Sequence, residues 1–165
     1  MQSKKVLFIS QAAMIAAIYV VLTVAFAPIS YGTMQVRISE ALTVLPLFTP
    51  AAVPGLFVGC MIANMIGGSI LPDIIFGSLT TMAAAAISYK LRKHQYLVPL
   101  PPIILNTLVV PFILYYGYQV NLPIPLIMLG VGFGEVISCG ILGTVLIKVL
   151  SRYAGRIFSL NRKMH

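Results

Sequence analysis

A charge-free stretch near the N-terminus decides the fold: VLFISQAAMIAAIYVVLTVAF, residues 6–26. A run of about 20 apolar residues is long enough to cross the hydrocarbon core of a bilayer as an α-helix. The stretch ends with Ala25, Phe26 and Ala27, which resembles a signal-peptide cleavage site. However, it is longer than the apolar core of a usual signal peptide, and Pro28 follows it directly. We therefore predict a retained membrane helix over about residues 5–27.

The composition extends this conclusion to the whole chain. Of the 165 residues, 59% are hydrophobic and 8% are charged, whereas soluble domains carry about 25% charged residues. An ordinary soluble domain is excluded because so few charges cannot cover a water-facing surface. The formal net charge is +8, but the basic residues are separated by long uncharged stretches, so we expect no nucleic acid partner. We predict a single integral membrane domain, residues 1–165, in contact with the lipid bilayer.

Prolines and glycines divide the remaining charge-free runs into further helices. The second and third are short and interrupted by proline, which in transporters points to a binding site. We expect the last helix to bend at Gly130, Gly132 and Gly134. The fold class predicted is an all-α bundle of six transmembrane helices. After the first, they cover about residues 39–48, 52–66, 73–89, 101–116 and 125–151.

Basic residues predict the orientation, because Lys and Arg near helix ends collect on the cytoplasmic side. With six helices, this rule places both termini in the cytoplasm and leaves Arg37 alone outside. The basic residues assigned to the cytoplasmic side are Lys4, Lys5, Lys90, Arg92, Lys93, Lys148, Arg152, Arg156, Arg162 and Lys163.

In this predicted orientation, all three acidic residues lie in the outer half of the membrane domain. Glu40 begins the second predicted helix, Asp73 begins the fourth, and Glu135 lies about ten residues into the sixth. A charge near the bilayer midplane costs about 2.5–3.5 kcal/mol or more, so Glu135 indicates function. Asp73 as an N-cap and Glu40 at the positive end of a helix dipole also have purely structural interpretations.

We predict that these acids converge with other polar groups on one outward-opening pocket for a small, flat, polar solute. The amides of Asn64 and Asn106 have a structural alternative, in which each only forms a hydrogen bond between two helices. The aromatic residues Tyr31, Phe76, Tyr115 and Phe133 offer stacking surfaces or face lipid. The predicted substrate-binding residues are Gln35, Arg37, Glu40, Asn64, Asp73, Phe76, Asn106 and Glu135.

Several kinds of chemistry find no support in the sequence. A phosphate-binding loop of the form GxxxxGK[ST] is absent, so the chain does not hydrolyse ATP by that route. His94 and His165 lie in basic segments away from the acids, which argues against a hydrolase or a metalloenzyme. Cys60 and Cys139 lie in apolar runs and behave as small hydrophobes. We therefore predict a binding protein that is not an enzyme, with no catalytic residues, no cofactor and no metal site.

Three sequence blocks carry a resemblance to a known family: GTMQVRISEAL at residues 32–42, GLFVGCMIAN at residues 55–64, and DIIFGSLT at residues 73–80. They resemble the queuosine-precursor transporter family (QueT type), whose members are substrate-binding S-components of energy-coupling factor (ECF) transporters. The resemblance implies a multi-pass protein of a prokaryotic plasma membrane. It also implies a complex with a transmembrane coupling protein and two ABC ATPases of an ECF module.

The resemblance implies roles for particular segments as well. Small residues one turn apart on the first helix suit close helix contact, either inside the bundle or with a partner. In the family such an alanine surface binds the coupling protein. The loop over residues 28–38 would gate the site, and the loaded subunit would topple in the membrane. The implied partner-binding residues are Ala12, Ala13, Ala16 and Ala17.

The implied substrate is a 7-deazaguanine precursor of queuosine, such as the aminomethyl base, the cyano base or queuine. Two alternatives stay open. The chain could be an S-component for another vitamin-like solute, or an autonomous small secondary transporter or facilitator with Glu135 as a proton-coupling carboxylate. A membrane enzyme acting on a small polar or lipid substrate is a further alternative.

Overall fold

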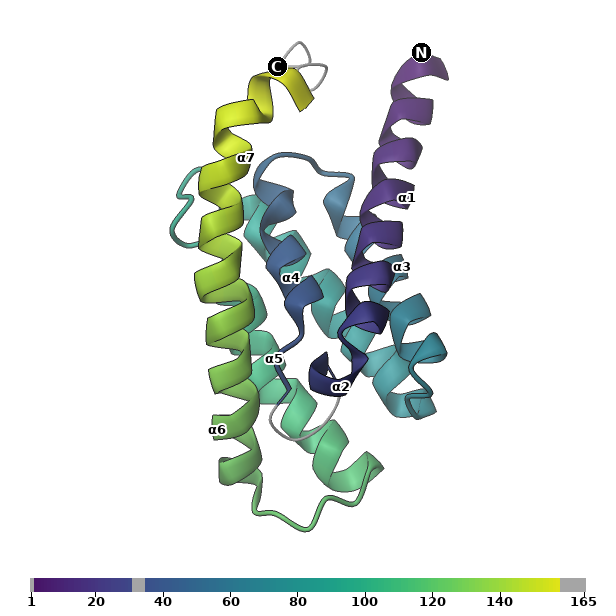
Figure 1. Cartoon of the computed structure of the whole chain (residues 1–165), viewed down its shortest axis with the longest axis vertical. Helices are drawn as coiled ribbons and strands as arrows, with labels where there is room; N and C mark the ends of the chain where they lie inside the picture. Colours follow the sequence, from purple (N-terminus) through teal and green to yellow (C-terminus); the bar gives the residue numbers. More distant parts are fainter. Residues whose placement is uncertain (1, 31–34, 158–165) are drawn as a thin grey trace.

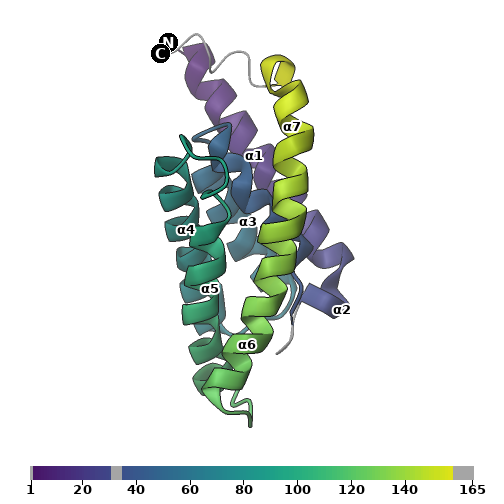
Figure 2. The same ribbon diagram turned by 90° about the vertical axis from the view of Figure 1, so that its left-hand side faces the viewer.

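The computed structural model describes residues 2–30 and 35–157, and the regular structure of this part is entirely helical, without a strand. Figures 1 and 2 show an elongated bundle in which the first turn of α1 and the last turn of α7 lie at the same end. The elements in chain order are α1 (Gln2–Ala25), α2 (Ala27–Ser30), η1 (Ile38–Leu47), α3 (Ala52–Ile66), η2 (Asp73–Gly77), α4 (Ser78–Lys90), α5 (Leu100–Phe112), η3 (Ile113–Gly117), α6 (Ile124–Glu135), η4 (Val136–Leu142) and α7 (Gly143–Ile157).

Several elements join end to end into longer helices. The π-helical segment η2 continues into α4, α5 continues into η3, and α6, η4 and α7 form one uninterrupted helix. Three stretches are long and apolar enough to cross a membrane, namely Lys4–Ala25, Leu100–Gly117 and Ile124–Tyr153. This all-helical, apolar architecture is that of a membrane protein. The count of six spans and the side on which the termini lie stay predictions.

The 3₁₀ segment η1 forms the centre of the bundle. Every residue from Ser39 to Pro46 is buried, because η1 packs against α1, α4, α7 and η4. A 3₁₀ helix rises about 2 Å per residue, so ten residues are too short to cross a core of about 30 Å. Runs of this geometry beyond 3–4 residues are uncommon and often mark a functional region. Here the run carries Glu40 into the interior.

Helices α1 and α3 pack at close range through small residues, which is one of the two roles expected for the alanines of the first helix. A Cβ atom on Gly55 would lie 2.7 Å from the Ala12 carbonyl oxygen, and one on Gly59 would lie 3.0 Å from the Ala16 Cα. Ala12, which is half-buried, and Ala16, which is buried, thus pack against α3, and their role in partner binding stays a prediction. The other two alanines, Ala13 and Ala17, are exposed.

Three π-helical segments, η2, η3 and η4, interrupt the long helices. The last helix departs from α geometry at Val136–Leu142, which comes after Gly130, Gly132 and Gly134 rather than at them. Wide turns of this kind are frequent at functional sites, because they turn side chains away from the regular helical register. All three segments contribute residues to the cavity or to the carboxylate cluster described next.

Candidate functional site

A polar cavity of about 370 Å³ lies between η1, η2, α5 and α6. Small-molecule sites in proteins fall in the range of about 300–1,000 Å³, so this volume suits a small solute. The described residues that line it are Gln35, Arg37, Glu40, Gly67, Gly68, Ser69, Asp73, Gly77, Thr81, Asn106, Val110, Ile113, Leu114, Tyr118, Val120 and Glu135.

Six of the eight predicted substrate-binding residues line this cavity. They come from segments that are far apart in the sequence. The three acids lie on three different helical segments and come close together only in the folded bundle. The structure thus brings the three acidic residues of the chain together around one space, although their role in binding stays a prediction. The six are Gln35, Arg37, Glu40, Asp73, Asn106 and Glu135.

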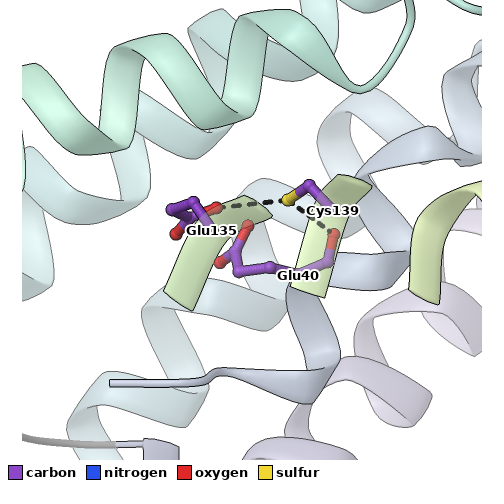
Figure 3. Close-up of side chains that lie close together, drawn as sticks. All are labelled: Glu40, Glu135 and Cys139. Atoms are coloured by element: carbon purple, nitrogen blue, oxygen red, sulfur yellow. Dashed lines mark hydrogen bonds between the residues drawn. The ribbon is translucent and has the colours of Figure 1, made fainter. Parts of the chain in front are cut away.

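The deepest part of the cavity holds two carboxylates side by side, Glu40 from η1 and Glu135 from the end of α6 (Figure 3). They are 2% and 6% exposed, respectively. Together with Cys139 they place three ligand-type atoms within 4.8 Å of one another. Two carboxylates this close repel each other when both are ionised, so the surrounding groups must offset the charge.

Hydrogen bonds hold the deep carboxylates in place. The Tyr19 hydroxyl donates to Glu40 Oε1. Asn106 Nδ2 donates to Glu135 Oε1 at 2.9 Å, and the Cys139 thiol lies 3.2 Å from Glu135 Oε2. Glu40 Oε2, by contrast, is buried and has no hydrogen-bond partner among the residues that the structure describes. A buried acceptor in this state costs roughly 1–3 kcal/mol, which a bound donor would recover.

Asp73 lies at a shallower level and is fixed by two neighbours. The Tyr118 hydroxyl donates to Asp73 Oδ2 at 3.0 Å and accepts a hydrogen bond from the Ile70 N–H at 3.3 Å. Partial burial and the nearby Asp73 carboxylate raise the pKa of Tyr118. Its hydroxyl therefore stays protonated at neutral pH and remains a donor. Asn64 Nδ2 contacts the Asp73 carbonyl oxygen at 3.4 Å.

Two predicted binding residues lie outside the cavity lining. Asn64 is fully buried behind Asp73, so it supports the start of η2 as an interhelical hydrogen-bonding amide. Phe76 is 57% exposed and lies on the outer face, beside a shallow apolar hollow. The reason is register: Asp73 and Gly77 face the cavity, and Phe76 precedes Gly77 by one residue and points away.

Of the two interpretations of the aromatic residues, the structure favours the outward-facing one for Tyr115 and Phe133. Tyr115 is 39% exposed and Phe133 is 62% exposed, and neither lines the cavity. Tyr31 lies outside the described residues. Among the described residues, the aromatic side chain that lines the cavity is Tyr118, and the apolar part of the lining comes from Val110, Ile113, Leu114 and Val120.

The segment before η1 closes against α6. The Val36 N–H donates to the Ile29 carbonyl oxygen at 2.8 Å, and Arg37 Nε lies 3.5 Å from the Ser30 carbonyl oxygen. The Gln35 backbone crosses directly over Gly134, where a Cβ atom would overlap the Gln35 carbonyl group. Gly134 therefore permits the close approach that places Gln35 and Arg37 at the cavity.

Sequence reasoning missed four contributors to the site: Tyr19, Thr81, Tyr118 and Cys139. Cys139 was interpreted as a small hydrophobe, yet its sulfur also contacts the Glu40 carbonyl oxygen at 3.3 Å and the Thr43 hydroxyl at 3.4 Å. Tyr19 had a usable signal, because it is a polar-tipped side chain within an otherwise apolar membrane helix. No comparable signal distinguished Tyr118 from the neighbouring tyrosines.

The fold and the cavity define the class of protein: a helical membrane protein that encloses a polar space of solute size, as membrane transport proteins do. The sequence profile of the QueT transporter family matches residues 9–152. The chain belongs to the QueT transporter family, as the resemblance indicated.

A curated relative points to the same family. The protein named queuosine precursor transporter QueT from Lactococcus lactis subsp. cremoris (strain MG1363) is 33% identical over 93 residues. The match covers 55% of this chain and 54% of the relative, so the chain aligns with about half the length of that protein. No solved structure matches the chain.

Proposed function

We propose that this protein is the substrate-binding membrane subunit, or S-component, of an ECF-type ABC importer. It captures a queuosine precursor, a 7-deazaguanine base, from outside the cell and delivers it inward. The observation that carries the proposal is the cavity, which is lined by three carboxylates and two amide side chains in a member of the QueT transporter family.

The chemistry of the cavity suits a deazaguanine. The pyrimidine edge of such a base presents adjacent N–H donors, and ionised carboxylates are acceptors that can take two donors side by side. Glu40 and Glu135 place four carboxyl oxygens, the acceptor atoms of such a group, in a desolvated position. The apolar residues Val110, Ile113 and Leu114 line the same cavity and offer a surface for the faces of the ring.

Uptake against a gradient requires an energy source, and the chain contains no phosphate-binding loop. The proposal therefore includes a transmembrane coupling protein and two ABC ATPases as partners. The exposed residues Ala13 and Ala17 on α1 leave a narrow outward surface on which the coupling protein docks. Ala12 and Ala16 act inside the bundle, where they set the distance between α1 and α3.

A ligand screen tests the substrate. The purified chain in detergent is heated with the aminomethyl and cyano deazaguanines, with queuine, and with a panel of vitamins. We expect only the deazaguanines to raise the midpoint of thermal unfolding, because bound ligand stabilises the folded state by about 2.7 kcal/mol at 100 times its dissociation constant. Stabilisation by a vitamin alone would show that the substrate is wrong.

A reconstitution experiment tests the S-component role. Proteoliposomes carry the chain alone or together with the coupling protein and the two ATPases, and uptake of labelled base is measured with and without ATP. We expect uptake only with all partners and ATP. Uptake by the chain alone would instead identify an autonomous transporter or facilitator.

A further inference from the structure

We propose that the cavity is divided into two subsites and that it selects a planar base with a cationic side arm. The deep carboxylates Glu40 and Glu135 bind the N–H edge of the base, and Asp73, held by Tyr118, binds the ammonium group of the arm. This inference rests on the proposed function and names the member of the substrate class that the site prefers.

The net charge of the cavity is the first reason to expect a cationic ligand. Among the described lining residues, three are acidic and one, Arg37, is basic. Even with one proton shared between Glu40 and Glu135, the acids outnumber the base. A cavity with an excess of negative charge in a low-dielectric setting favours a cation over a neutral molecule of the same shape.

The deep subsite is incomplete without a ligand. Glu40 is 2% exposed, its Oε1 accepts from Tyr19, and its Oε2 has no partner among the described residues. Both oxygens of Glu135 have partners, Asn106 and Cys139. Since every ionised oxygen has more than one acceptor position, adjacent N–H donors of one base edge can satisfy Glu40 Oε2 and bridge to Glu135.

Asp73 is also held ready in position. Tyr118 binds Oδ2 and is itself fixed by the Ile70 N–H, and Asn64 contacts the Asp73 backbone. Gly77 leaves the other oxygen uncovered, because a Cβ atom there would lie 2.8 Å from Asp73 Oδ1. A carboxylate fixed in this way binds an ammonium group at little ordering cost. A nitrile has no proton to donate, so the cyano base gains nothing from Asp73.

The experiment compares two bases that share the ring and differ in the arm. The dissociation constants of the aminomethyl and cyano deazaguanines are measured by calorimetry on the wild-type chain in detergent at neutral pH. We expect the aminomethyl base to bind roughly 10- to 100-fold more tightly, the range typical of a hydrogen bond to a charged partner. Equal affinities, or tighter binding of the cyano base, would overturn the inference.

Substitutions at Asp73 and Tyr118 test which residues produce the preference for the aminomethyl base. In Asp73→Asn we expect the affinity for the aminomethyl base to fall to that for the cyano base, while the affinity for the cyano base stays unchanged. Tyr118→Phe, which keeps the ring, should reduce the preference in part. An equal loss for both bases in Asp73→Asn would contradict the assignment of the arm to Asp73. If neither base binds the wild-type chain, the proposed function fails and the two-subsite inference fails with it.

Discussion

The most informative single substitution is Gly134→Ala, because it tests whether the segment before η1 must lie against α6 for the site to form. The new Cβ atom would overlap the Gln35 carbonyl oxygen and lie 2.9 Å from the carbonyl carbon. The overlap with the oxygen is the tighter of the two contacts, so the Gln35 backbone must retreat by about 1 Å or more to restore ordinary van der Waals separations.

A retreat of that size affects the hydrogen bond from the Val36 N–H to the Ile29 carbonyl oxygen, which is now 2.8 Å long. Lengthened by the same amount, it would exceed the usual range of about 2.7–3.2 Å. The lost bond and the overpacking together cost about 2–4 kcal/mol. Because Arg37 and Glu40 follow in the same segment, we expect ligand affinity to fall by about 10- to 100-fold.

The assay is the dissociation constant for a deazaguanine base, measured with the midpoint of thermal unfolding of the ligand-free protein. Gly140→Ala is the matched control on the same long helix, since a Cβ atom at Gly140 would lie at ordinary contact distances of 3.7 and 3.8 Å from its neighbours. We expect this control to bind like the wild type. If Gly134→Ala binds as tightly as Gly140→Ala, the contact between Gln35 and α6 is not required for the site.

Three further substitutions test separate parts of the structure. Glu135→Gln should weaken binding of both deazaguanines by about 10-fold or more, because the amide keeps only one acceptor oxygen where the carboxyl group has two. Calorimetry that shows unchanged affinity would count against the deep subsite. Ala17→Leu should leave ligand binding intact but abolish uptake in proteoliposomes that contain the full transporter. Ala16→Leu should instead lower the midpoint of thermal unfolding, because Ala16 is buried against α3. Gly55→Ala should also destabilise the folded chain, by about 1–3 kcal/mol of overpacking, because its Cβ atom would lie 2.7 Å from the Ala12 carbonyl oxygen; an unchanged unfolding midpoint would contradict this contact.

The sequence predicted the positions of the helices and the convergence of the acids. Proline and glycine mark helix boundaries by their own backbone chemistry, and α3 begins and ends where predicted, at Ala52–Ile66. The three acids could be predicted as site residues because placing a carboxylate in the apolar part of a membrane costs free energy on any face of a helix. Glu40, Asp73 and Glu135 accordingly line one cavity.

The sequence did not predict which apolar side chains point into the bundle and which point outward. In a soluble protein, polarity separates the inner face of a helix from the outer face, but in a membrane both faces are apolar. Phe76 and Leu114 are therefore equivalent as sequence signals, although Phe76 is exposed and Leu114 lines the cavity. The alanines of α1 present the same problem: Ala13 and Ala16 have the same side chain, and only the position of Gly59 shows that Ala16 faces inward.

The deep carboxylates connect binding to the stability of the whole bundle. Glu40 belongs to the central segment η1 and Glu135 to the longest helix, so repulsion between them, when both are ionised, acts between two elements that pack directly against each other. Tyr19 and Asn106 offset part of it by hydrogen bonds to Glu40 and Glu135, respectively. A ligand with two adjacent donors bridges the pair, and a cationic arm reduces the remaining negative charge. We therefore expect such a ligand to tie η1 to the long helix through this pair of carboxyl groups, so that binding raises the midpoint of thermal unfolding of the whole bundle.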